Sequence, residues 1–245
     1  KAMLTDEETK NDGMGGWQVD TSWQTAVSWL LAFEGGVLEQ NDYRFLTPNN
    51  IAAFKFVRQI TEKGCAFQAA PDADKYKAFA NREALFSVIG LEEFPEQSRA
   101  FSDASNADEW IPIAFPGKEK NGLIVYGSSY VILKSSAQEQ LAAWLFARWM
   151  LDPAQDKRMV ETTHLFPLRN STLSLLADYG KTHPQWADAV KLLPDATMQP
   201  QLVSWRAVKV MIGDGFDSMF RLNMPSGRVA EVLVMMEATS RELSK

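Results

Sequence analysis

Short apolar segments alternate with longer stretches of helical periodicity, and this alternation constrains the fold more than any other feature of the sequence. Residues 84–90 form one apolar segment, which ends at a glycine. Two more, residues 124–126 and 130–133, flank Gly127-Ser128-Ser129. Such segments predict β-strands, and strands separated by helices are typical of a layered α/β fold. We therefore expect a buried strand at residues 84–90 and two short strands around the Gly-Ser-Ser segment.

Capping residues mark where several helices begin. Residues 20–32 carry apolar side chains at helical spacing. Thr47-Pro48 predicts the start of a second helix, because threonine caps a helix and proline fits its first turn. Ser136 and Glu139 form a capping box, which predicts a third helix. Further helices are expected at residues 76–80, around Trp186, from Trp205 through Met219, and from Pro225-Ser226 onward.

The charge of the chain narrows the kinds of partner it can have. Its 245 residues include 25 Lys and Arg against 31 Asp and Glu, which gives a net charge of −6. A nucleic-acid or anionic-membrane surface needs a basic patch, so neither partner is expected. No apolar stretch approaches the roughly 18 residues that cross a membrane. Cys65 is the only cysteine, which excludes an intrachain disulfide and a cysteine-based zinc site.

Common nucleotide-binding and hydrolase motifs are absent from the sequence. It contains no P-loop, no G-x-G-x-x-G fingerprint, no G-x-S-x-G elbow and no H-E-x-x-H pair. The run Gly13-Met14-Gly15-Gly16 follows no predicted strand, and we interpret the first fifteen residues as a mobile lead-in. The only histidines are His164 and His183, on which any metal cluster or Ser-His-Asp relay would depend. No metal, cofactor or catalytic residue is predicted.

Three local features are open to more than one interpretation. The carboxylates of Glu92 and Glu93 have three interpretations: an acid/base pair, a polar ligand contact or solvated charge. Adjacent residues do not lie on opposite sides of a glycosidic bond, as the two carboxylates of a glycosidase do. His164 is either catalytic or a hydrogen-bonded structural residue. Gly127-Ser128-Ser129 either offers amides and hydroxyls to ligand oxygens or is an ordinary turn.

Tryptophan is abundant in this chain. Tryptophan rings stack on flat, partly apolar partners such as sugar rings, but they also fill protein cores. Both roles stay open for each of the eight residues, which are Trp17, Trp23, Trp29, Trp110, Trp144, Trp149, Trp186 and Trp205.

Several segments carry a family resemblance through their sequence, order and spacing over residues 17–245. They read FANREALF at residues 79–86, DEWIPIAFPG at 108–117, YGSSYVI at 126–132, AAWLF at 142–146, FPLR at 166–169 and PQLVSWRAV at 200–208. Together they resemble the extracellular solute-binding proteins of ABC importers, in the group that includes maltose- and glycerol-phosphate-binding proteins.

The resemblance implies a type II periplasmic-binding-protein fold, in which two α/β lobes clamp a ligand between them. In this α/β architecture the chain would supply mostly the second lobe. Residues 1–121 and 169–245 would build that lobe, with the C-terminal helices in the latter part. Residues 122–168 would return to a first lobe that is mostly lacking, so we expect exposed apolar surface along residues 123–133.

The resemblance also implies a set of ligand-binding residues. The segment around Asp20, Ser22 and Trp23 corresponds to a loop and helix start that face the ligand from the second lobe. Trp205 corresponds to a tryptophan that stacks on sugar in maltose binders. The complete predicted set is Asp20, Ser22, Trp23, Glu92, Gly127, Ser129, His164 and Trp205.

The remaining members of this set correspond less uniformly to the family pattern. Gly127 and Ser129 match a cleft-facing Gly and Ser of glycerol-phosphate binders. Glu92 stands where maltose binders have an aromatic platform, which argues against maltose itself as the ligand. His164 stands where glycerol-phosphate binders often have glycine.

A transport function is therefore expected: capture of a carbohydrate or related polyol between two lobes, without chemical conversion and without a cofactor. The implied partners are the small-molecule solute and the membrane permease of an ABC importer. A monomer is expected, in the periplasm or outside the cell, with or without a lipid anchor. Two alternatives stay open. A glycoside-acting enzyme would turn over its substrate, whereas a Trp-rich helical interaction module would bind a macromolecule and ignore sugars.

Overall fold

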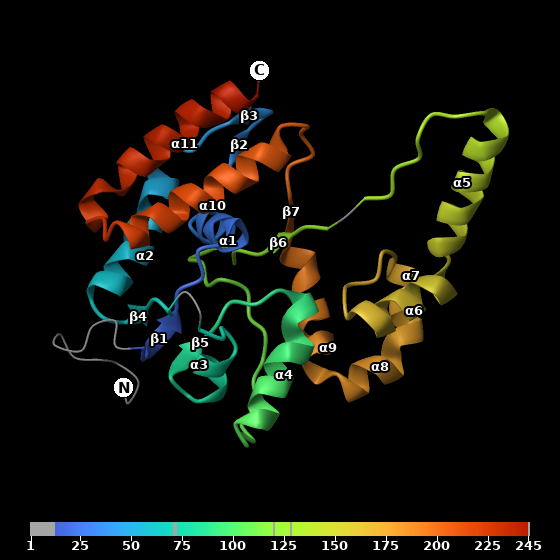
Figure 1. The fold of residues 1–245 in the computed structure, drawn as a ribbon, viewed down its shortest axis with the longest axis horizontal. Coiled ribbons are helices and arrows are strands. Elements are labelled where there is room, and N and C mark those ends of the chain that lie inside the picture. The colour runs from blue at the N-terminus through green and yellow to red at the C-terminus, as the bar shows by residue number, and fades with distance from the viewer. Residues whose placement is uncertain (1–12, 71–72, 120, 128, 245) are drawn as a thin grey trace.

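The computed structural model describes residues 13–70, 73–119, 121–127 and 129–244, and its first sheet consists of three parallel strands. The central strand β1 (Gly15–Gln18) pairs with β4 (Ala66–Phe67) on one side and with β5 (Ala84–Phe86) on the other (Figure 1). Gly15 and Gly16 thus lie in a strand, which corrects their assignment to a mobile lead-in. Gly16 lets the backbones approach, since a Cβ there would lie 3.1 Å from the carbonyl oxygen of Cys65. Residues 1–12 of the predicted lead-in are outside the described residues.

Strand β5 lies at the edge of this sheet and is only partly buried. Ala84 is buried, whereas Leu85 and Phe86 are about half exposed. The prediction of a buried strand through residues 84–90 is therefore wrong in both extent and burial. Within the described residues no further strand pairs with β5, so one edge of its backbone has no strand partner.

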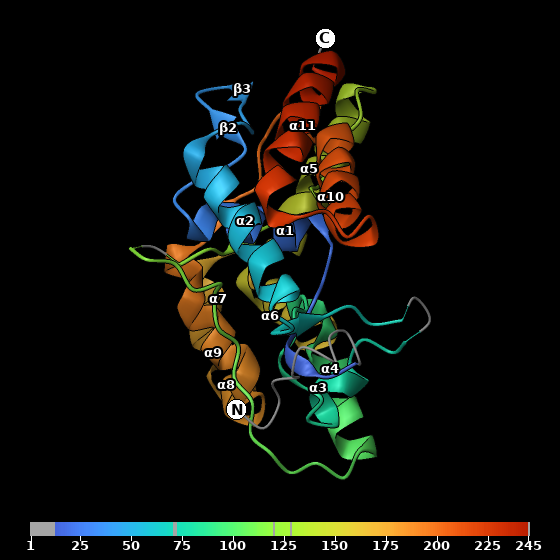
Figure 2. The ribbon, with the colours of Figure 1, turned by 90° about the vertical axis from the view of Figure 1, so that its left-hand side faces the viewer.

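Four helices pack together and form the main hydrophobic core. They are α1 (Trp23–Ala32), α2 (Pro48–Glu62), α10 (Trp205–Arg221) and α11 (Val229–Leu243). As predicted, Thr47 caps α2, where its side chain accepts the N–H of Asn50. The apolar face of α10 packs against α1 and α11, which places the C-terminal helices beside the first helix of the chain (Figures 1 and 2).

Smaller elements complete this part of the molecule. A hairpin of β2 (Leu38–Glu39) and β3 (Asp42–Tyr43) lies beside α11. The remaining elements near the sheet and helices are α3 (Lys77–Ala80), the 3-10 helix η1 (Leu91–Glu93), α4 (Phe94–Asp103) and the 3-10 helix η4 (Ser226–Arg228).

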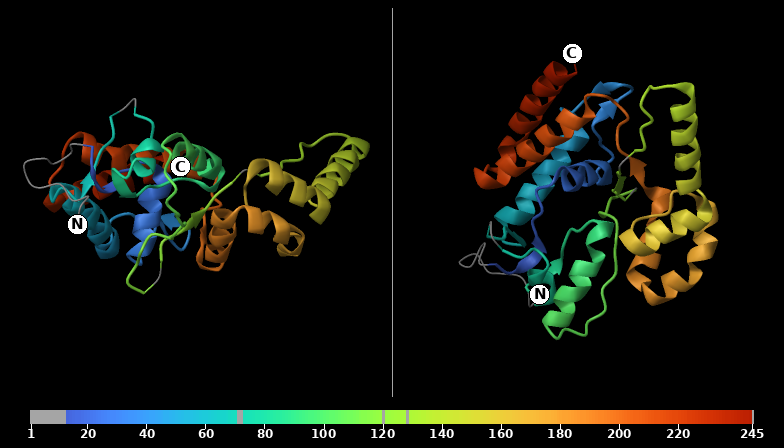
Figure 3. Two further views of the ribbon diagram at one scale, coloured as in Figure 1. Left: turned by 90° about the horizontal axis from the view of Figure 1, so that it is seen from below. Right: turned by 45° about the vertical axis from the view of Figure 1, so that its right-hand side comes forward.

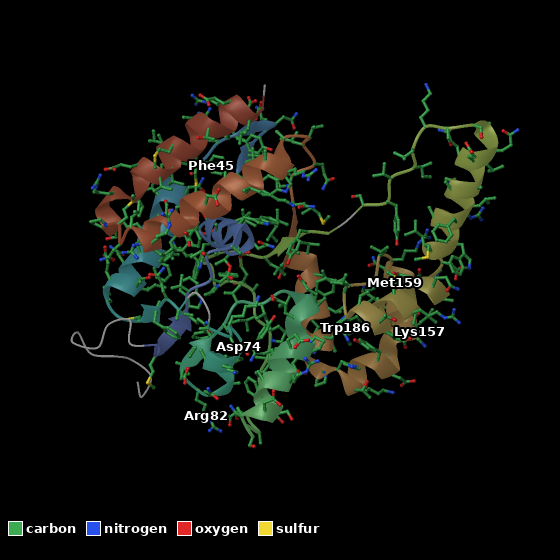
Figure 4. The ribbon with its side chains drawn as sticks, in the orientation of Figure 1. Phe45, Asp74, Arg82, Lys157, Met159 and Trp186 are labelled. Atoms are coloured by element: carbon green, nitrogen blue, oxygen red, sulfur yellow. The ribbon has the colours of Figure 1, made fainter. Side chains whose placement is uncertain are left out.

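A second group of short helices forms its own hydrophobic cluster. The group contains α6 (Pro153–Thr163), α7 (Asn170–Leu173), η2 (Ser174–Leu176), α8 (Ala177–Thr182), α9 (Pro184–Leu192) and η3 (Leu193–Asp195). Val160, Leu176, Tyr179 and Trp186 are buried against one another. Trp186 is labelled in Figure 4, where it lies among these helices and away from Phe45 of the main core.

Two very short strands connect this second helical group to the first group, which consists of the three-stranded sheet and the four core helices. β6 (Ile124–Val125) leads out of the first group and β7 (Thr197–Met198) leads back, and the two strands pair in parallel. A single hydrophobic cluster includes residues on both sides of residue 168, the predicted end of the returning segment. The lobe boundaries stay a prediction.

Beyond β6 the chain is extended, and the strand expected at residues 130–133 does not form. No described strand lies beside this segment to pair with it, and Val131 and Leu133 are 76% and 78% exposed. The expectation of exposed apolar surface along residues 123–133 is confirmed for this stretch.

Helix α5 (Ala137–Met150) extends the exposed apolar surface. Its predicted capping box is present, with the Ser136 N–H donating to Glu139 at 3.1 Å and the Glu139 N–H donating to the Ser136 hydroxyl at 3.3 Å. None of its residues is buried, and it stands at the end of the molecule farthest from α2 (Figure 3). Its exposed apolar side chains are Leu141, Trp144, Leu145, Phe146 and Trp149. None of the helices in the described ranges is long and apolar enough to cross a membrane.

Candidate ligand-binding site

The loop before α1 is held in a fixed conformation by Asp20. Its carboxylate accepts the backbone N–H of Ser22 at 3.1 Å and the Ser22 hydroxyl at 2.5 Å, and it also accepts the hydroxyl of Thr25. The Ser22 side chain in turn accepts the N–H of Thr25, which caps α1. These contacts position the first residue of the helix, Trp23.

Trp23 is the centre of an aromatic cluster built from three distant segments. Its ring lies 5.4 Å from that of Tyr126 and 5.4 Å from that of Trp205, with nearly perpendicular planes in the second pair. The ammonium of Lys209 lies 5.6 Å from the centre of the Trp23 ring, within cation–π range. We call Trp23, Tyr126, Trp205 and Lys209 the Trp23 cluster. It forms where β6, α1 and α10 meet.

Polar side chains surround this cluster. The hydroxyl of Tyr126 donates to Glu92 at 3.2 Å, and Gln199 accepts the indole N–H of Trp205 at 3.0 Å. Burial, followed by the nearby charge of Glu92, raises the pKa of Tyr126 to about 12. Tyr126 therefore stays a neutral hydroxyl at physiological pH. The combination of aromatic faces with a carboxylate, an ammonium and amide groups suits a ligand that has both apolar and hydroxyl surfaces.

Glu93, the other half of the carboxylate pair, is used for local structure. It accepts the N–H of Gly90 at 2.7 Å and the hydroxyl of Tyr76 at 2.9 Å, and it pairs with Lys75. Partial burial alone would raise the pKa of Glu93, but these three hydrogen bonds outweigh it and lower the pKa below its usual range. An anionic, fully engaged Glu93 is unsuited to donate a proton. The described residues contain no group of three or more His, Cys, Asp or Glu side chains that could hold a metal ion.

The structure brings four of the eight predicted site residues together. Trp23 and Trp205 are in contact, Glu92 contacts the cluster through Tyr126, and the Gly127 carbonyl accepts from Gln199 at 3.4 Å. Asp20 and Ser22 lie immediately before Trp23. Ser129 is exposed.

His164 lies in the second helical group. It ends α6 with a left-handed backbone conformation (φ 61°), and its Nδ1 lies 2.5 Å from the hydroxyl of Tyr179. The ring of His183 stacks on Tyr179 on the same side of the group, with the two centres 4.0 Å apart. The contacts of His164 are thus with the α8 region and not with the Trp23 cluster.

Three residues of the site, namely Tyr126, Lys209 and Gln199, are not among the eight predicted ligand-binding residues. Tyr126 directly precedes the predicted Gly127. Lys209 follows Trp205 by one helical turn, so the two share a helix face. These two spacings were available signals, whereas nothing in the local sequence distinguishes Gln199.

Comparison with known proteins agrees with this geometry. The family of bacterial extracellular solute-binding proteins matches residues 2–194. The chain belongs to this family. Its members bind solutes and are not enzymes, which favours binding over glycoside hydrolysis. No curated protein matches the sequence of the chain.

Solved structures show that this solute-binding family member has the type II periplasmic-binding-protein fold. The chain is similar to the sugar-binding protein MalE of Xanthomonas citri, with a TM-score of 0.77, 17% identity, and coverage of 96% of this chain and 60% of that one. It is also similar to UgpB of Mycobacterium tuberculosis in complex with glycerophosphocholine, with a TM-score of 0.71, 18% identity, and coverage of 97% and 60%. The chain thus spans about 60% of the length of these structures.

Proposed function

We propose that the chain is part of the substrate-binding component of an ABC importer. This component would capture a carbohydrate or related polyol between two lobes without chemical conversion. The Trp23 cluster carries this proposal, because it combines ring faces with polar groups at the junction of two differently packed parts of the molecule. MalE of Bdellovibrio bacteriovorus bound to maltotriose is one structure to which this fold is similar, with a TM-score of 0.68, 14% identity, and coverage of 98% of this chain and 64% of that one.

The lobe boundaries of the proposal follow the hydrophobic clusters. Residues up to the end of β6, together with those after β7, would form the second lobe. The segment between β6 and β7 would belong to the first lobe. This segment therefore ends later in the chain than residue 168, the boundary expected from the sequence. The cluster of Val160 with Leu176, Tyr179 and Trp186 supports this longer segment. The exposed apolar side chains of α5 would pack against the portion of the first lobe that the chain does not contain.

Within this site the partly exposed ring of Trp23 would stack on the ligand, and Glu92 would accept ligand hydroxyls. Trp205, which is buried in the main core, would support Trp23 through their ring contact instead of stacking on the ligand itself. Asp20, Ser22 and Ser129 would supply further polar contacts at the junction. A membrane permease as partner, a monomeric state and a periplasmic or extracellular location with or without a lipid anchor complete the proposal.

Calorimetric titration of the complete protein with a panel of neutral sugars and polyols tests this function. Trp23→Ala should weaken binding of any confirmed ligand by about 1–3 kcal/mol, as loss of an aromatic contact typically does. Trp110→Ala is the matched control, because Trp110 packs on Phe94 at 5.2 Å and has no ring contact with the Trp23 cluster. Equal affinity in the wild type and Trp23→Ala would remove Trp23 from the site. Absence of binding across the panel would contradict the carbohydrate assignment.

A further inference from the structure

Gln199, the first residue after β7, contacts three segments at once. Its backbone N–H donates to the carbonyl of Val125 at 3.0 Å and continues the β6–β7 pairing. Its side-chain oxygen accepts the indole N–H of Trp205 at 3.0 Å, and its side-chain nitrogen donates to the carbonyl of Gly127 at 3.4 Å. One side chain therefore joins the exit of β6, the exit of β7 and the start of α10.

These contacts close into a ring that includes the Trp23 cluster. Gly127 follows Tyr126, whose ring contacts Trp23, and Trp23 contacts Trp205. Trp205 returns to Gln199 through its indole N–H. The segment after β6 thus contacts the aromatic cluster by two routes, through Tyr126 and through Gln199.

This hydrogen bond contributes to the orientation of Trp205, together with the stacked ring of Tyr43 and the perpendicular ring of Trp23. Trp205 is only 5% exposed, and a buried indole N–H without an acceptor is costly, so the ring favours the orientation that reaches Gln199. The backbone of Gln199 is in turn fixed by the β6–β7 pairing, which connects the two helical groups.

We propose that Gln199 is a positioning residue that couples the angle between the two connecting segments to the orientation of the Trp205 ring. The inference rests on the proposed function, because closure of two lobes is the motion that would change this angle. When the exits of β6 and β7 rotate against each other, Gly127 moves relative to Gln199. The Gln199 side chain then carries that displacement to the indole of Trp205, so that Trp205 supports the Trp23 ring in its ligand-binding position in only one of the two lobe arrangements.

Two substitutions separate the two side-chain contacts. Gln199→Glu keeps an acceptor for the indole N–H but loses the donor to Gly127. Gln199→Met loses both groups at similar length. Gln201→Met is the matched control, because the exposed Gln201 side chain donates only to the Gln199 carbonyl, at 3.1 Å.

The experiment uses the complete protein without ligand and has two readouts. The indole N–H resonance of Trp205, assigned by its loss in Trp205→Phe, reports the hydrogen bond. Pulsed electron spin resonance between spin labels at Lys55→Cys and Lys157→Cys, in a Cys65→Ser background, reports the distance between the two groups. Lys55 lies on α2. Lys157, which is labelled in Figure 4, lies on α6.

We expect Gln199→Glu to broaden the distance distribution while the Trp205 resonance keeps its hydrogen-bonded position. Gln199→Met should broaden the distribution and shift the resonance upfield, and Gln201→Met should change neither. A Gln199→Glu distribution identical to that of the wild type would overturn the proposal, as would an unshifted resonance in Gln199→Met. Both readouts are taken without ligand, whereas the calorimetry measures ligand binding. A failure of the carbohydrate assignment would therefore appear in the calorimetry alone and is distinguishable from a failure of the Gln199 proposal.

Discussion

Replacing Glu237 by alanine tests how α11 is held against the chain that leads into α2. Glu237 is 8% exposed, and one of its carboxylate oxygens accepts the N–H groups of Phe45 at 3.1 Å and Leu46 at 2.9 Å. The other oxygen pairs with Arg44 at 3.3 Å and with Arg241 at 2.6 Å. The carboxylate thus satisfies two backbone donors that have no strand partner.

The expected loss follows from these contacts. A hydrogen bond to a charged group contributes about 1.5–3 kcal/mol. Phe45 is fully buried, so its N–H would lose its partner outright, whereas the half-exposed Leu46 can recover water. The two guanidinium groups are largely exposed and add little. We expect Glu237→Ala to lower the free energy of unfolding by about 2–3 kcal/mol, which is about 1 M in the urea midpoint for a chain of this size.

Urea unfolding followed by circular dichroism measures this shift. Glu231→Ala is the matched control, since Glu231 lies on the same helix and only pairs with the exposed Arg228. Burial alone would raise the pKa of Glu237, but the N–H groups of Leu46 and Phe45, together with the charges of Arg44 and Arg241, hold it below its ordinary value. Its stabilising contribution is therefore complete above the unfolded pKa of about 4.3 and is lost as the pH falls through the lower folded pKa. Equal midpoints for Glu237→Ala and Glu231→Ala at pH 7 would refute the reasoning.

Two further predictions concern the second helical group and α5. Asp156→Ala should destabilise the α6–α9 group by about 2–4 kcal/mol, because the buried Asp156 accepts the N–H of Leu168 and the hydroxyl of Thr172. Hydrogen exchange at the Leu168 amide measures this effect, and unchanged protection would contradict it. Phe146→Glu should reduce binding of an apolar fluorescent dye to the 245-residue chain, because it interrupts the exposed apolar face of α5. Gln138→Glu, an equal change of charge in the first turn of α5, serves as control, and equal dye binding in the two variants would show that the face does not act as one surface.

Features encoded within a few residues could be predicted from the sequence. Thr47-Pro48 and the Ser136–Glu139 capping box fix helix starts through contacts within one turn, and the structure has both. The apolar face of α10 was likewise readable, since helical spacing alone places Trp205, Val208 and Ile212 on one side.

Strands were predicted less well, because a strand depends on a partner elsewhere in the chain. Residues 130–133 have the apolar composition of a strand but no described neighbour, and they do not pair. The opposite error occurred at Gly15-Gly16, where a glycine pair that suggests mobility is held between β4 and β5. Local composition does not contain this information in either case.

The candidate site was partly predictable for a related reason. Trp23 and Trp205 could be selected by resemblance, and the structure places their rings in contact. Tyr126 and Gln199 acquire their roles only because β6 and β7 pair, which no local pattern in the sequence specifies. The left-handed backbone of His164, which directs its ring toward Tyr179, was equally invisible.

The pairing of α1 with α10 has a consequence for how the chain folds. The two helices belong to one core but are separated in sequence by the whole segment from β6 to β7. The apolar faces of α1 and α2 that pack on α10 and α11 therefore have no partner until those two helices have been made, and closing so long a loop precedes the gain from packing. Folding of the main core is consequently a late, non-local event that begins only after synthesis of the C-terminal helices, whereas the α6–α9 group needs only contacts between near neighbours and can form first.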